Sequence, residues 1–284
     1  GRNFCNKLWN IARFGQEQIG DNHVIVPLDP QTPADHWIIR QINQAAVDIE
    51  KNLAQYRFSE AADVVYHMVW DDLADWYIEA SKTAINRPLL SWSLATSLQL
   101  AHPFAPFVTE TIWQTLNYTK GILMAEKWPA PEEFDEISAE QFERIRELVS
   151  EGRWVITELP GNKKYSMFYG NDSTIEQNQA VIKHLMRLEN ITHIDQPQGL
   201  RLAATNREAW LDVDSETLYQ HQSNLELRLV EARQRQGNLQ ARLDNPAYVE
   251  KAPAKLVEET KNELVETEKL ISRLVGELDV IQLD

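Results

Sequence analysis

An apolar side chain returns at every seventh position across residues 215–284. A strict seven-residue repeat is the period of a coiled coil. Asn245, Pro246 and Pro253 separate two such halves, so the pattern predicts an antiparallel helical hairpin within one chain. Each arm would be about 43 Å long at a rise of 1.5 Å per residue. The repeated positions are Leu218, Leu225, Ala232 and Leu239 in the first half and Val257, Leu264, Ile271 and Leu278 in the second.

Residues 1–120 have the pattern of an α-helical bundle. Thr32 is a typical N-cap residue, and the following Pro33 is favoured at the first position of a helix. Seven of the nine tryptophans lie at or before Trp128, so the main core is expected in this part, with Trp9 inside it. A loop is expected at residues 21–29. Helices are predicted over residues 2–19, 33–53, 58–83, 87–100 and 106–116.

Residues 121–214 carry a mixed pattern that indicates a small α+β module. The whole chain is therefore predicted to be mainly α, with three parts at residues 1–120, 121–214 and 215–284. Within the module, helices are expected over residues 138–157 and 174–188, and strands over residues 164–169, 191–194, 201–205 and 209–213.

Composition excludes several classes of protein. The single cysteine, Cys5, cannot form an internal disulfide framework or a zinc site with two thiolates. The chain has no run of 18 apolar residues and no signal peptide at its start, so we expect a cytoplasmic protein that does not enter a membrane. A net charge of −15 argues against a protein that coats nucleic acid, but it leaves room for local basic surfaces.

Three spaced motifs carry a family resemblance. Together they are similar to the anticodon-binding helical bundle of class Ia aminoacyl-tRNA synthetases, which the valyl, isoleucyl and leucyl enzymes share. The motifs are NFCNKLWNxxRF at residues 3–14, DWYIE at residues 75–79 and HPFxPFxTExIW at residues 102–113.

The segment between the two heptad helices distinguishes among these enzymes. NPAYVEKAPA, at residues 245–254, resembles the C-terminal arm of bacterial valyl-tRNA synthetases. Isoleucyl enzymes often end in a cysteine-rich zinc module, which one cysteine cannot build. An isoleucyl- or leucyl-type fragment stays an alternative, as does a coiled-coil module that binds proteins and never touches RNA.

The resemblance implies a tRNA-binding fragment of an enzyme that attaches valine to its tRNA with ATP and Mg²⁺. The catalytic signatures of the family, HxGH and KMSKS, do not occur in this chain. We therefore expect the fragment alone to be inactive, to have no catalytic residue, and to hold no cofactor or metal. Its expected partner is valine tRNA, and a monomer is expected.

The first helix holds the candidate anticodon-binding residues. By resemblance, Lys7, Arg13 and Phe14 match positions where valyl enzymes meet the anticodon loop. The chemistry agrees, since lysine and arginine bind phosphate and an aromatic ring stacks on an unpaired base. The alternative is that Phe14 belongs to the core and the cations are simply solvated.

Cations on the hairpin are the candidate contacts to the body of the tRNA. The first arm has a net charge of +1 and the second arm −4, so RNA should meet the first arm and the tip. Ordinary ion pairing across the seam is the alternative for each arginine. The candidates are Arg228, Arg235, Arg242 and Lys251.

Two further polar features are interpreted as structural. His102 is expected to close a helix C-terminus, where the helix dipole favours it. The aspartates at positions 71, 72 and 75 are expected to form a solvated helix face.

Overall fold

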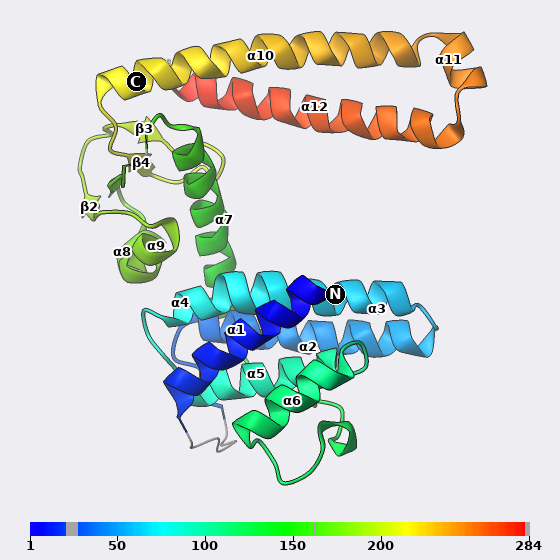
Figure 1. Ribbon diagram of the computed structural model, residues 1–284. Coiled ribbons are helices and arrows are strands. Elements are labelled where there is room, and N and C mark those ends of the chain that lie inside the picture. The colour runs from blue at the N-terminus through cyan, green and yellow to red at the C-terminus, as the bar shows by residue number, and fades with distance from the viewer. Residues whose placement is uncertain (21–27, 162, 282–284) are drawn as a thin grey trace. The chain divides into compact units, whose positions relative to one another are not determined.

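A computed structural model describes residues 1–20, 28–161 and 163–281 (Figure 1). The chain forms two compact units, Gly1–Arg146 and Glu147–Asp284. The predicted mainly α fold with a small α+β part is confirmed. Most of the loop expected at residues 21–29 lies outside the described residues. The three-part division at residues 120 and 214 stays a prediction.

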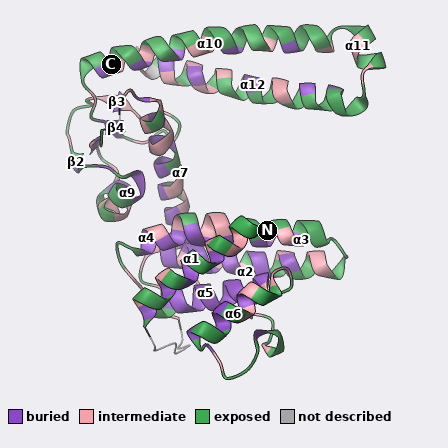
Figure 2. Cartoon of the chain, viewed as in Figure 1, coloured by how far each residue is buried: buried purple, intermediate pink, exposed green. Residues whose placement is uncertain are grey.

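The first unit is a bundle built around one buried helix. Helix α5 (Arg87–Ala101) is buried on almost every side, including Ser93 and Ser97 (Figure 2). A helix enclosed in this way lies at the centre of its bundle. The other elements of this unit are α1 (Arg2–Ile19), α2 (Pro33–Ala54), α3 (Phe58–His67), the π-helix η1 (Met68–Ile78), α4 (Glu79–Ser81), α6 (Pro106–Leu116), the 3-10 turn η2 (Leu123–Ala125) and the first part of α7 (Glu136–Glu158).

The predicted start of the second helix is confirmed. The Thr32 hydroxyl accepts a hydrogen bond from the Asp35 backbone N–H at 3.2 Å, and the Asp35 carboxylate accepts one from the Thr32 N–H at 3.1 Å. This reciprocal capping box satisfies two donors that the first turn leaves unpaired. The buried Asp35 also accepts a hydrogen bond from the Tyr77 hydroxyl at 3.1 Å, which ties α2 to a distant part of the chain.

The helix predicted over residues 58–83 is helical but not α-helical throughout. Its middle, η1 (Met68–Ile78), is a π-helix between α3 and α4. π-helical turns are rare and are often found at functional sites. Hydrophobic spacing of three to four residues does not separate the two helix types over so short a stretch, so the sequence carried no signal for this difference.

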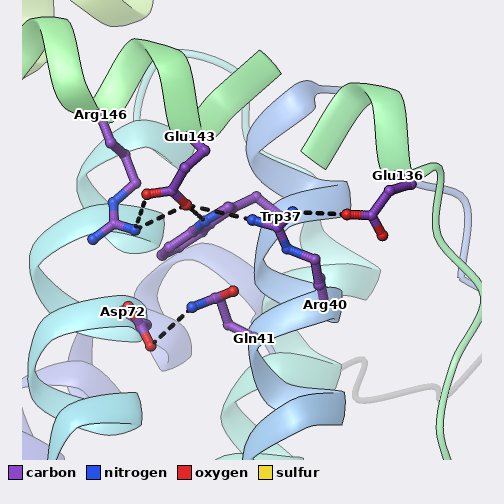
Figure 3. Close-up of polar contacts among 7 residues, drawn as sticks. All are labelled: Trp37, Arg40, Gln41, Asp72, Glu136, Glu143 and Arg146. Atoms are coloured by element: carbon purple, nitrogen blue, oxygen red, sulfur yellow. Dashed lines mark hydrogen bonds and ion pairs between the residues drawn. The ribbon is translucent and has the colours of Figure 1, made fainter. Parts of the chain in front are cut away.

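A polar network fixes the start of α7 on α2 (Figure 3). The buried Trp37 donates its indole N–H to Glu143 at 2.7 Å, and Arg40 donates to Glu136 at 2.9 Å. The Arg146 guanidinium lies 4.5 Å from the centre of the Trp37 ring and bonds to Glu143 at 2.9 Å. The ring, two arginines and two glutamates thus attach this part of α7 to the bundle.

The second unit contains a four-stranded sheet in the order β2-β1-β4-β3. Strand β1 pairs parallel with β2 and antiparallel with β4, and β4 pairs antiparallel with β3. The strands are two or three residues long. The elements are β1 (Met167–Tyr169), α8 (Ser173–Gln177), α9 (Gln179–Met186), β2 (Ile191–His193), β3 (Leu200–Arg201) and β4 (Ala209–Leu211).

All four strands of this unit are shorter than predicted, and one predicted helix is interrupted. The helix expected over residues 174–188 breaks at Asn178, whose side-chain amide donates to the Thr174 carbonyl at 2.9 Å. Asparagine competes for backbone partners in this way and interrupts helices. The strand expected over residues 201–205 ends at Arg201, because the carboxylate of Glu151 accepts the backbone N–H groups of Ala204 and Thr205.

The predicted antiparallel hairpin is confirmed. Helices α10 (Ser215–Leu243) and α12 (Ala254–Ile281) lie side by side, with the short α11 (Pro246–Lys251) at the turn (Figure 1). Their buried seam follows the heptad positions. It contains Leu225, Ala232, Leu274 and Leu278, with the half-buried Leu229, Ile271 and Ile281 against it. No helix in the described ranges is both long and apolar enough to cross a membrane.

Candidate nucleic-acid interface

Helix α1 buries one face and exposes the other. The buried face packs on α5, and it is so close at Gly15 that an added Cβ would lie 2.7 Å from the Leu94 side chain. The opposite face is exposed at intervals of three or four residues, which is the spacing of one stripe on a helix. This exposed stripe consists of Arg2, Asn6, Trp9, Arg13 and Gln16.

Trp9 corrects an expectation. It was predicted to lie in the core, but it is 41% exposed on the stripe that also carries Arg13. The apolar spacing of α1 places Leu8, Ile11 and Ala12 inward, and a residue directly after Leu8 faces away from them. The prediction that Trp9 is buried rested on the hydrophobicity of its side chain and is wrong.

Lys7 is held within the bundle. Its ammonium lies 2.6 Å from the Asp75 carboxylate and 4.9 Å from the centre of the Trp70 ring. Only 24% of the Lys7 side chain is exposed. Both partners lie on η1, so this lysine joins α1 to the π-helical segment and would have to exchange Asp75 for a phosphate in order to contact RNA.

Arg13 and Phe14 differ in their surroundings. Arg13 is exposed, and its side chain has no ion pair with any other residue in the described part of the chain. Phe14 is half-buried, and the Lys82 ammonium lies 5.6 Å from the centre of its ring. Phe14 is therefore neither a fully enclosed core residue nor a free surface ring. Lys82 was not singled out by its sequence context, because it lies 68 positions from Phe14.

The hairpin cations fall into two groups. Arg228 pairs with Glu158, and Arg235 pairs with Glu263 across the seam, so both are already neutralised. Arg242 and Lys251 are exposed near the turn, and within the described ranges neither side chain has an acidic partner. The two residues near the turn are thus exposed and carry no ion pair among the described residues.

An aromatic and ionic cluster joins the base of the hairpin to α7. The Arg273 guanidinium lies 3.5 Å from the centre of the Trp154 ring and bonds to Glu277 at 3.1 Å, while Arg228 lies 6.0 Å from the same ring. Burial raises the pKa of Glu277 despite the nearby Arg273. Burial lowers the pKa of His221 on α10, which is 1% exposed. The cluster consists of Trp154, Glu158, His221, Arg228, Arg273 and Glu277.

The remaining polar candidates have structural partners. His102 ends α5 as predicted, and its Nδ1 lies 2.8 Å from the Thr109 hydroxyl. Asp71 binds His67 at 2.6 Å, and this bond raises the histidine pKa. Asp72 is half-buried, and burial raises its pKa to about 6. Among the described residues, no group of three or more histidine, cysteine, aspartate or glutamate side chains could hold a metal ion.

Two family models match this chain. The family model described as the anticodon-binding domain of tRNA ligase matches residues 35–164. The model described as the valyl tRNA synthetase tRNA binding arm matches residues 217–282, which cover the hairpin. The chain belongs to the valyl-tRNA synthetase family. It corresponds to the C-terminal tRNA-binding region of that family. Helix α1 lies outside both matched ranges.

Relatives in the valyl-tRNA synthetase family match nearly the whole chain. The valine–tRNA ligase of Thermotoga maritima is 31% identical over 96% of this chain and 33% of its own length. Those of Petrotoga mobilis and Chromobacterium violaceum are each 32% identical over 96% of this chain, and over 34% and 32% of their own lengths. The chain thus spans about a third of the length of the curated relatives it matches.

Proposed function

We propose that this chain binds valine tRNA as part of an enzyme that attaches valine to that tRNA. The observation that carries the proposal is the match of residues 217–282 to a tRNA-binding arm, because these residues fold as the long hairpin described above. The relatives are valine–tRNA ligases, which favours a valyl over an isoleucyl or leucyl enzyme.

Each part of the chain has a proposed role. The bundle, residues 1–120, binds the anticodon loop through Arg13 and Phe14, with Lys7 exchanging Asp75 for RNA. The module, residues 121–214, connects the bundle to the arm. The hairpin, residues 215–284, contacts the body of the tRNA through Arg242 and Lys251 and, once their ion pairs open, through Arg228 and Arg235.

The chemistry of the proposed parent enzyme lies outside this chain. Valine activation would use ATP and Mg²⁺, and the HxGH and KMSKS signatures for that step do not occur in this sequence. We therefore expect no exchange of pyrophosphate with ATP by the purified chain. The proposed location is the cytoplasm, where the ribosomes use aminoacyl-tRNA, and the proposed state is a monomer.

The test is a titration of the purified chain with valine tRNA and with an unrelated tRNA over a range of salt concentrations. Valine tRNA should bind more tightly, and its affinity should fall as salt rises because phosphate contacts release counterions. Phe14→Ala should weaken binding by about 1–3 kcal/mol, the value of one base stack. A core phenylalanine would instead cost about 3–5 kcal/mol of stability.

Paired melting and binding measurements separate these two outcomes. A large loss of melting temperature with normal binding by the folded protein would show that Phe14 is a core residue. Arg13→Ala, which removes an exposed side chain, should weaken binding without changing the melting temperature. Equal affinity for both tRNAs at every salt concentration would contradict the proposed function.

A further inference from the structure

Three cations gather at the C-terminal end of α1. Arg13 is exposed there, Lys82 lies over the Phe14 ring, and Arg87 donates from Nε to the Gln18 carbonyl at 2.8 Å. Gln18 lies one helical turn after Phe14, on the same side of α1. Among the described residues of α1 and α4, Glu17 and Glu79 carry acidic side chains. Such a cluster is notable in a chain with a net charge of −15.

The position of Lys82 is held by a weak contact. Its ammonium lies 2.6 Å from the Glu79 carboxylate, three residues earlier. The two side chains are 36% and 39% exposed, and ion pairs this accessible contribute little to stability. Lys82 can therefore leave Glu79 at little cost when a stronger anion approaches.

Lys82 also covers a face of the Phe14 ring. An unpaired base that stacks on this face must displace the ammonium, which lies 5.6 Å from the ring centre. A stacked nucleotide carries its phosphate within reach of a lysine side chain that starts beside the ring. The displaced ammonium would then exchange a screened carboxylate for a phosphate, the anion that dominates RNA affinity.

We propose that Lys82 is an RNA-binding residue of the Phe14 site, and that it moves from Glu79 to the phosphate of the nucleotide stacked on Phe14. The proposal rests on the proposed function, since it concerns the same anticodon-binding site. A purely structural role would be different: Lys82 follows α4, and a cation at a helix C-terminus stabilises the helix dipole. That role affects folding and leaves the number of phosphate contacts unchanged.

The experiment compares Lys82→Gln with Lys51→Gln in the full chain. Both changes remove one positive charge, and Lys51 lies in the last turn of α2. The helical rise places it about 24 Å along α2 from Asp35, which contacts Asn86 next to Arg87. The ligand is the isolated anticodon stem-loop of valine tRNA, titrated over a salt series.

Lys82→Gln should weaken binding several-fold at low salt. It should also lower the slope of log Kd against log salt by about 0.7–0.9, the value of one phosphate contact. Lys51→Gln should change neither quantity. Glu79→Gln should tighten binding, because it removes the carboxylate that competes for Lys82. The slope is the decisive readout, since partial unfolding lowers the active fraction without changing the number of counterions released.

Two results would overturn the inference while the proposed function stands. In both, Arg13→Ala still weakens binding of the stem-loop. In the first, Lys82→Gln and Lys51→Gln give the same slope as the wild type. In the second, Glu79→Gln binds no more tightly than the wild type. This result would show that Lys82 does not leave Glu79 for a phosphate of the RNA. Failure of the wild-type chain to distinguish valine tRNA from an unrelated tRNA would instead overturn the proposed function itself.

Discussion

At the scale of single residues, Asp72 lies in an unfavourable environment for its charge. The carboxyl is half-buried on η1 and accepts a hydrogen bond from Gln41 at 3.5 Å (Figure 3). Burial raises its pKa from 3.8 to about 6, although the charge of Arg146 opposes the shift. The folded state therefore binds more protons than the unfolded state between these two values. The free energy of unfolding falls as pH rises through this window.

Asp72→Asn should stabilise the bundle near neutral pH. The amide keeps the shape of the carboxyl and removes the cost of burying a charge, which is on the order of 1–3 kcal/mol at pH 7. The gain in melting temperature should be largest above pH 6 and should disappear below about pH 3, where the wild-type carboxyl is mostly protonated in both states. Thermal unfolding at several pH values measures it.

Asp71→Asn is the matched control. Asp71 is the neighbouring residue, but 47% of its side chain is exposed and it is bound to His67 at 2.6 Å, so its loss should not raise the melting temperature. An equal gain from both variants would show that general acidity of the chain, and not burial at position 72, lowers the stability.

At the scale of elements, the base of the hairpin depends on a flat cation stacked on an indole. Arg273 on α12 covers Trp154 on α7 at 3.5 Å and also binds Glu277. One oxygen of Glu277 is buried without a hydrogen bond to any described residue. The loss of Arg273 would leave this carboxyl with no compensating charge.

Arg273→Ala should loosen the hairpin base by about 1–3 kcal/mol, from a lost cation–π contact and an unpaired acid. Arg273→Lys should restore little, because an ammonium does not stack as a planar guanidinium does. Hydrogen exchange of residues 271–281 and 221–229 measures the effect. Arg233→Ala, which removes an exposed arginine of α10, is the control. Equal exchange in Arg273→Ala and Arg233→Ala would contradict the role of this contact.

At the scale of the whole molecule, the proposed role of the hairpin is contact with the body of the tRNA. The 29 residues of α10 extend about 43 Å at 1.5 Å per residue. The cations near its turn, Arg242 and Lys251, have no acidic partner among the described residues, whereas Arg228 and Arg235 are paired.

The double variant Arg242→Ala, Lys251→Ala should therefore weaken binding of whole valine tRNA and leave binding of its anticodon stem-loop unchanged. The loss of affinity for whole tRNA should be larger at low salt than at high salt, because two phosphate contacts disappear. Arg235→Ala should have a smaller effect, since this arginine must first leave Glu263. A comparable loss for both ligands would show that these residues do not act by contacting the body of the tRNA.

Local patterns in the sequence determined the elements of this protein and its family. The seven-residue repeat predicted the hairpin seam, and Thr32 with Pro33 predicted a helix start that the capping box confirms. The motifs at residues 3–14 and 245–254 pointed to the valyl-tRNA synthetase family. These signals are local in the sequence, because helix caps and heptad spacing depend on residues only a few positions apart.

Only the tertiary structure decided which site residues are free and which are occupied. Lys7 is bound by Asp75, Phe14 is covered by Lys82, and Trp154 is stacked against Arg273. Each contact joins side chains at least 68 positions apart. Sequence spacing predicts partners only within a helix or a strand, so it does not show which distant side chain a cation will contact. The same holds for Trp9, whose exposure depends on which face of α1 packs against α5.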